Sequence, residues 1–186
     1  MSHVETTYDV HCKTYAALFH TAWHLLDCAE RHTEGSLLNL QAATVFFAFA
    51  FEAYLNHVGS EELKFWDEID RISYGRKLRI LSKHLSFPLD AHPFETVTTL
   101  FKLRNALAHG RTQKRTITKP GGPPPRDEAF RLLPWEQLTA ATVRQYHDDV
   151  RDAMTSINAA RPSPDPLPLN PGPRGYSVRV IQDGTA

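Results

Sequence analysis

The chain of 186 residues is long enough for one domain with a sizeable core. Its 21 basic and 21 acidic side chains cancel, so no overall field draws it to nucleic acid or to an anionic membrane, and any such attraction must be local. The start lacks the basic and apolar regions of a signal peptide, and the most apolar run, at 42–51, is about half the roughly 20 residues that a membrane span needs. We therefore expect a soluble, cytoplasmic protein that does not enter a membrane.

The first half of the chain predicts two long helices. Apolar residues recur at three- and four-residue steps over residues 10–33, and Ser36 is expected to cap a second helix that runs to about Val58. The second helix is apolar on nearly every face, which predicts the most buried element or a subunit contact; its one formally charged residue is Glu52. Cys12 and Cys28 fall about 24 Å apart along the first helix, too far for a disulfide, and are expected to be free thiols.

The second half predicts three further helices and a long loop. A short charged helix at 61–69 precedes a basic amphipathic helix at 74–85. The next helix is expected to begin at His92-Pro93, because proline suits a first turn, and to run to His109, where Gly110 ends it. Residues 111–134 are rich in glycine and proline and predict a loop that is either functional or disordered. A last helix is expected from Trp135 to about Ala160.

The C-terminal segment differs in composition from the rest. After Arg161 it is proline-rich and should be extended, and residues 175–182 could add a short strand or a docking segment. The sequence thus predicts an all-α bundle of four or five helices over residues 8–160, with a long basic loop before the last helix, and a proline-rich tail over residues 161–186.

One arginine stands out in the helix at 92–109. The apolar stripe of this helix continues to Arg104, and a guanidinium in that place needs a carboxylate or a wet cleft. Glu52, the lone charge on the most buried helix, needs a partner too, so we predict that the two meet. Asn105 and His109 lie one turn apart on nearly the same face. Arg104, Asn105 and His109 can therefore border one cleft.

The surrounding stretch is strongly basic. From Thr96 to Arg126 there is no acidic residue and the net charge is +7, while the rest of the chain carries −7. Such a stretch suits a phosphate-bearing ligand. The residues expected to contact phosphate or RNA are Lys102, Arg111, Lys114 and Arg115. The alternative is that basic side chains near a helix C-terminus only complement the helix dipole and that the loop is simply solvated.

The sequence RNALAH at 104–109 places a polar residue directly after the arginine and a histidine five positions after it. This pattern resembles the Arg-x4-6-His motif of HEPN domains, the helical bundles named for higher eukaryotes and prokaryotes nucleotide-binding. FAFEAYLN at 49–56 is similar to the second-helix segment of that family, where a glutamate often faces the motif arginine. The helix order is similar from about residue 10 to 160, and the tail is not covered.

The resemblance implies a homodimer in which two such motifs face each other across a cleft. Many family members are metal-independent endoribonucleases, often toxins or antiviral defence proteins. It further implies that His109 acts as general base or acid at the ribose 2′-hydroxyl and that Arg104 stabilises charge on the pentacoordinate phosphate. Asn105 would orient the histidine or the phosphate, Glu52 would support Arg104, and the product would carry a 2′,3′-cyclic phosphate. No cofactor or metal is expected.

Two other functions stay open. The same cleft could bind RNA or a nucleotide without cutting it, as in other members of the family. Alternatively, the chain could bind a protein, for example a nucleotidyltransferase-like antitoxin, through its tail and basic loop.

A histidine and cysteine row on the first helix gives a further candidate site. The pair His20 and His24 has zinc-like spacing, and Cys28 and His32 continue the row. Successive four-residue steps drift by about 40° around a helix, and the row lies largely on the polar face. We therefore do not expect a metal site there.

Overall fold

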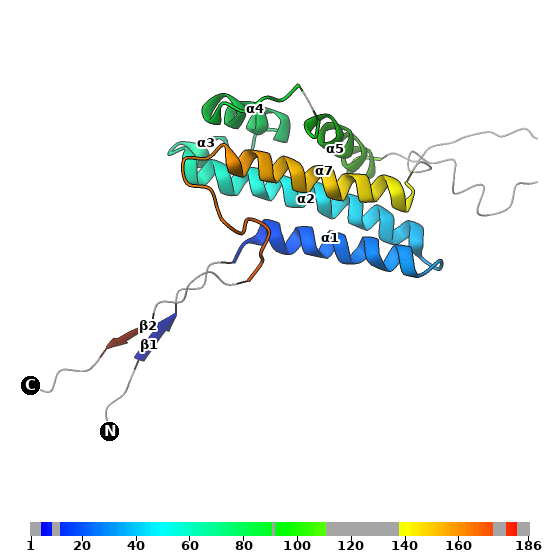
Figure 1. The fold of residues 1–186 in the computed structure, drawn as a ribbon, viewed down its shortest axis with the longest axis horizontal. Helices are drawn as coiled ribbons and strands as arrows, with labels where there is room; N and C mark the ends of the chain where they lie inside the picture. Colours follow the sequence, from blue (N-terminus) through cyan, green and yellow to red (C-terminus); the bar gives the residue numbers. More distant parts are fainter. Residues whose placement is uncertain (1–4, 9–11, 91, 111–137, 173–177, 182–186) are drawn as a thin grey trace, which may run out of the picture.

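The computed structural model describes residues 5–8, 12–90, 92–110, 138–172 and 178–181, and the described chain is mostly helical (Figure 1). For the two short strands only the backbone is described. The helices are α1 (Thr14–Arg31), α2 (Ser36–Glu62), α3 (Trp66–Ile69), α4 (Tyr74–Leu85), α5 (Phe94–Ala108) and α7 (Ala140–Ala159). The strands are β1 (Glu5–Tyr8) and β2 (Val178–Ile181). The all-α class predicted from the sequence is confirmed in the form of a helical bundle.

Helix α2 lies at the centre of the bundle and packs against α1, α4, α5 and α7. In Figure 1, α1 lies on one side of α2 and α7, and α4 and α5 lie on the other. This position follows from a sequence that is apolar on nearly every face, because only a helix with neighbours all round can bury such a surface. Its largest fully buried side chains are Phe47, Phe51 and Tyr54, which meet Phe101 of α5 in one core.

Burial of α2 is nevertheless incomplete. Among the described residues it is the one helix long and apolar enough to cross a membrane by length and composition, a test that core helices also pass. Of the 18-residue apolar stretch of α2 that meets this test, 39% is buried in the bundle. The central helix therefore also presents apolar side chains at the surface.

The start and the end of α2 differ from the prediction. The helix begins at Ser36 with Gly35 as its N-cap, so the expected capping role of Ser36 is wrong by one residue. Gly35 has a left-handed φ of 71°, which glycine adopts without strain. The helix then continues through Gly59 to Glu62. A β-carbon at Gly59 would lie 2.2 Å from the Trp66 ring, so this glycine permits close packing and does not end the helix.

The other helices follow the predicted order. Helix α4 has the predicted bounds, and α5 ends with His109 at its C-cap. Helix α7 begins at Ala140 because the side chain of Thr139 accepts a hydrogen bond from the Thr142 backbone N–H, at 3.1 Å. The predicted loop at 111–134 lies outside the described residues.

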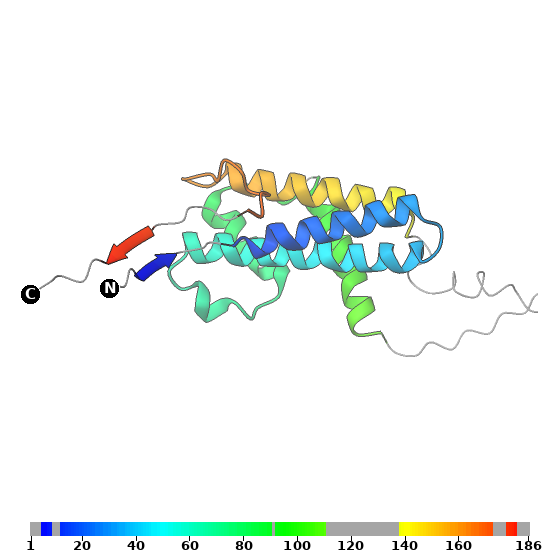
Figure 2. The same ribbon diagram turned by 90° about the horizontal axis from the view of Figure 1, so that it is seen from below.

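The two ends of the chain meet in a ribbon. Strand β1 pairs antiparallel with β2, with Glu5 opposite Ile181 and Tyr8 opposite Val178. Both strands lie beside the termini, away from the helices (Figures 1 and 2). The possible strand at 175–182 is thus present at 178–181, while β1 has no counterpart among the predicted elements.

The segment after α7 returns to the bundle. Arg161 and Asp165 are buried, and Asn158 exchanges two hydrogen bonds with the backbone of Asp165. Asp165 also pairs with Lys13, immediately before α1, at 2.7 Å. This part of the proline-rich tail, drawn in orange in Figure 1, therefore ties the end of α7 to the start of α1.

Candidate functional site

Arg104, near the end of α5, forms an ion pair with Glu52 in the middle of α2. The Nη2 atom of Arg104 lies 2.9 Å from Oε2 of Glu52. The two side chains are 22% and 27% exposed, so the pair is partly shielded from water. This contact confirms the predicted meeting of the two residues. A partly desolvated pair of this kind holds its members more firmly than a surface pair does.

The guanidinium of Arg104 has further neighbours. Its Nη1 donates a hydrogen bond of 2.9 Å to the side-chain oxygen of Asn105. Its central carbon lies 5.3 Å from the Phe49 ring centre and 5.9 Å from that of Phe101, within the range of cation–π attraction. Its Nε is buried and has no hydrogen-bond partner among the residues described. A carboxylate, an amide and two aromatic rings thus fix the position of the guanidinium.

His109 lies just beyond Arg104 and is exposed at the C-cap of α5. Its backbone N–H bonds to the Asn105 carbonyl at 2.9 Å, which places Asn105 and His109 one turn apart, as predicted. Within the described ranges no hydrogen bond joins the imidazole to another group. The Asn105 side chain contacts Arg104 and not His109. Among the described residues, therefore, Arg104 is held by other side chains, whereas the side chain of His109 is exposed.

The expected phosphate contacts divide into two groups. Lys102 is exposed on α5, one helical position before Leu103, which packs against the core. Arg111, Lys114 and Arg115 lie outside the described residues.

An apolar strip leads along α2 to the Glu52–Arg104 pair. Leu38, Ala42, Val45 and Phe49 recur at three- and four-residue steps, and Glu52 is the next position. Leu38 is 69% exposed and Phe49 40% exposed, while Ala42 and Val45 are partly exposed. The apolar character of α2 on nearly every face was the signal for this strip, but it did not separate its exposed positions from its buried ones.

The phenylalanines of α2, at positions 46, 47, 49 and 51, have two roles. Phe47 and Phe51 are fully buried, as expected of core residues. Phe46 is partly buried, and Phe49 contacts the Arg104 guanidinium at the surface. The contribution of Phe49 to the site was missed by the sequence interpretation. Its position three residues before Glu52, and so on the same face of the helix, is the signal that could have found it.

The histidine and cysteine row on α1 is not assembled into a single site. In the part of the chain that the structure describes, no group of three or more His, Cys, Asp or Glu side chains is arranged to hold a metal ion. His20 contacts the Leu169 carbonyl oxygen at 3.0 Å, and His24 lies 3.6 Å from the sulfur of Cys28. Cys12 and Cys28 are free thiols.

Comparison with known protein families, curated proteins and solved structures finds no match for this chain.

Proposed function

We propose that this chain is a HEPN-like, metal-independent endoribonuclease of the toxin or defence type. The observation that carries the proposal is the position of Arg104, which is held by Glu52 and Asn105 and lies five residues before the exposed His109. Arginine presents planar donors that suit a phosphate, and histidine exchanges a proton near neutral pH. Cleavage by an RNA 2′-hydroxyl needs a group that transfers a proton and a group that stabilises charge on the phosphate, and these two side chains can supply both.

In the proposed reaction, His109 accepts the proton of the ribose 2′-hydroxyl while its oxygen attacks the adjacent phosphorus. The bond from phosphorus to the 5′-oxygen breaks, and that oxygen takes up a proton from a second acid. The products are a 2′,3′-cyclic phosphate and a free 5′-hydroxyl. Arg104 stabilises the additional negative charge on the phosphate in the transition state. The reaction needs no metal ion or cofactor.

The proposal includes a homodimer, since the described part of one chain places a single histidine, His109, beside Arg104. The strip of Leu38, Ala42, Val45 and Phe49 leads directly to Glu52, and a twofold contact along it would bring two Arg104 sites close together. The second acid is then the equivalent histidine of the other copy. A dimer would also explain why the central helix α2 has exposed apolar side chains, because the second copy would cover them. The protein would act in the cytoplasm, where its RNA substrate is found.

One observation favours a second function. Both terminal nitrogens of Arg104 already bond to protein groups, Glu52 and Asn105. An arginine with both nitrogens occupied could stabilise the fold without taking part in catalysis. The protein would then bind RNA or a nucleotide without cutting it, or bind a nucleotidyltransferase-like antitoxin.

The experiment that separates these functions is incubation of the purified protein with total cellular RNA in EDTA, followed by sequencing of the RNA ends. The wild type is expected to produce cyclic-phosphate ends, and His109→Ala is not. His84→Ala is a matched control, because His84 is exposed on α4. If folded, dimeric wild type binds RNA but produces no new ends, the binding function replaces catalysis.

A further inference from the structure

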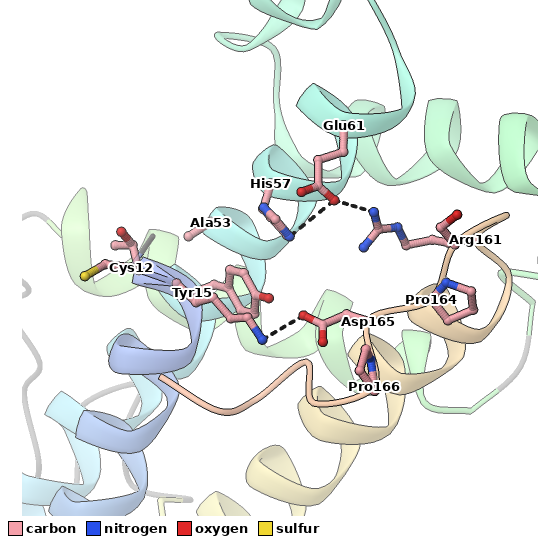
Figure 3. Close-up of a pocket in the computed structure, with 12 residues that line it drawn as sticks. Cys12, Tyr15, Ala53, His57, Glu61, Arg161, Pro164, Asp165 and Pro166 are labelled. Carbon is pink, nitrogen blue, oxygen red and sulfur yellow. Dashed lines mark hydrogen bonds and ion pairs between the residues drawn. The ribbon is translucent and has the colours of Figure 1, made fainter. Parts of the chain in front are cut away.

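A pocket of about 630 Å³ lies between the start of α1, the C-terminal half of α2 and the segment that follows α7 (Figure 3). Its volume is within the range of pockets that hold small-molecule ligands. Ala53, His57 and Glu61 contribute the α2 wall. None of the residues of the Arg104 site lines it, so the pocket is a separate feature of the fold.

Two buried cations line this pocket. The side chains of Lys13 and Arg161 are only 7% and 6% exposed. Lys13 pairs with Asp165 at 2.7 Å, and Arg161 contacts both Glu61 and Glu62, the latter at 2.8 Å. Charged groups are costly to remove from water, even when they are paired. Their concentration around an open pocket suggests a use beyond joining the helices.

Arg161 has an unused donor group that points into the pocket. Its Nε and Nη2 atoms bond to Glu62 and Glu61, whereas no partner for Nη1 is found among the described residues. Nη1 is not one of the unpaired polar atoms that are sealed from solvent. In Figure 3 the guanidinium is directed toward the space enclosed by Tyr15, His57 and Asp165. A ligand in the pocket can thus accept a hydrogen bond from a buried, fixed guanidinium.

Glu61 supplies an acceptor beside this donor. Its side chain is 47% exposed, and its Oε2 atom contacts Arg161 and lies 3.6 Å from Nε2 of His57. No donor to the other oxygen, Oε1, is present in the described part of the chain. The two unused groups come from one ion pair and therefore lie close together. A ligand that both accepts and donates hydrogen bonds would satisfy them.

The charges of the pocket limit the kind of ligand. Lys13 and Arg161 are balanced by Asp165 and Glu61, and Glu62 adds a negative charge behind Arg161. A multiply charged anion such as phosphate would meet these carboxylates at close range, which is unfavourable. A molecule with one negative and one positive group matches the pocket instead.

We infer that this pocket binds a small zwitterion of the amino-acid class, with its carboxylate on Arg161 and its ammonium on Glu61. The stacked rings of Tyr15 and His57, 4.9 Å apart, provide a wall against which the side chain of the ligand can pack. The inference is independent of the proposed ribonuclease function, because it uses other residues and requires no RNA.

Titration calorimetry of the full chain with each standard amino acid tests this inference. At least one amino acid is expected to bind with a Kd below about 1 mM. Its decarboxylated amine and its N-acetyl derivative should bind at least about tenfold more weakly, because each lacks one charge. Inorganic phosphate is not expected to bind in the pocket. Failure of every amino acid to bind the folded wild type at this level overturns the inference.

Two variants locate the binding. Glu61→Gln removes the charge that would hold the ammonium, and Ala53→Leu narrows the pocket without changing a charge; each should weaken binding by about tenfold or more. Glu30→Gln is the matched control, because Glu30 pairs with Arg144 outside the pocket. Thermal unfolding of each variant verifies the fold. Binding that is the same in all three variants and the wild type places the ligand elsewhere and contradicts the inference.

Discussion

Arg104 on α5 and Glu52 on α2 are joined by an ion pair of 2.9 Å, between two residues 52 positions apart in the chain. The pair fixes the end of α5, and with it the position of His109, relative to the central helix. Its partial burial distinguishes it from the ion pairs on the outer surface. We expect that loss of this ion pair lowers both the free energy of unfolding and the rate of RNA cleavage.

A double-mutant cycle with Glu52→Gln and Arg104→Gln should give a coupling energy of about 1 to 2 kcal/mol in chemical denaturation, because the pair is partly desolvated. The matched pair is Asp27 and Arg31 on α1, in which the arginine side chain is 69% exposed. Its coupling should be about 0.5 kcal/mol or less, as for other exposed pairs one turn apart on a helix. Equal coupling energies for the two pairs would show that the Glu52–Arg104 contact has no special role.

Gly59 and Gly75 offer a paired test of the packing around α2. Gly59→Ala should destabilise the protein by about 1 to 3 kcal/mol, because the new β-carbon overlaps the Trp66 ring. Gly75→Ala on α4 meets nothing within 4 Å and should be neutral or stabilise by up to about 1 kcal/mol. Urea unfolding of the two variants measures both effects. A Gly59→Ala protein as stable as the wild type would mean that Trp66 does not pack against α2 in this way.

The tail makes different contributions before and after Gly172. A chain that ends at Arg161 loses Asp165, the partner of buried Lys13, and should lose about 2 kcal/mol or more of stability. A chain that ends at Gly172 keeps this contact and loses β2, a strand of a two-stranded ribbon that adds little stability by itself. Its loss should be below about 1 kcal/mol. Denaturation curves that rank the two truncations in the opposite order would contradict this account.

This difference also affects how a role of the tail in partner binding can be tested. A chain that ends at Gly172 is expected to keep the bundle folded, so a loss of partner binding can then be assigned to residues 173–186. Removal from residue 162 would confound binding with unfolding.

The dimer can be tested with two exposed apolar positions. Leu38→Glu places a charge on the α2 strip and should convert the dimer to a monomer in sedimentation velocity. Phe65→Glu is the control, since Phe65 is 48% exposed just before α3 and away from the strip. A wild type that remains monomeric at every concentration used, or a Leu38→Glu protein that is still dimeric, would rule out this interface.

The sequence was most informative where one helical period dominates. Apolar spacing predicted the bounds of α4 and the order of the helices. It also predicted the Glu52–Arg104 contact, because a charged residue on an apolar helix face has few possible partners. The predicted end of the second helix near Val58 was too early, because α2 continues to Glu62. The glycine that follows Val58 packs closely against Trp66, a contact that spacing along the chain does not reveal.

Long-range contacts account for the remaining differences. The pairing of β1 with β2 joins residues from the two ends of the chain, and neither four-residue strand has enough alternating pattern to predict its partner. The burial of Asp165 depends in the same way on Lys13, about 150 residues earlier. The burial of Arg161 depends on Glu61 and Glu62, about 100 residues earlier. The sequence could not predict which face of α2 is exposed, because apolar residues occur on nearly every face of this helix.

The most direct test of the central claim is single-turnover cleavage in EDTA of a short RNA that contains a site mapped by end sequencing. We predict that the wild type cuts this RNA to a 2′,3′-cyclic phosphate and leaves uncut the same RNA with one 2′-deoxy sugar at that site. His109→Ala and Arg104→Ala should each reduce the rate by about a hundredfold or more. Equal cleavage of the deoxy-substituted RNA, or unchanged rates in both folded variants, would contradict the claim that Arg104 and His109 catalyse attack by the 2′-hydroxyl.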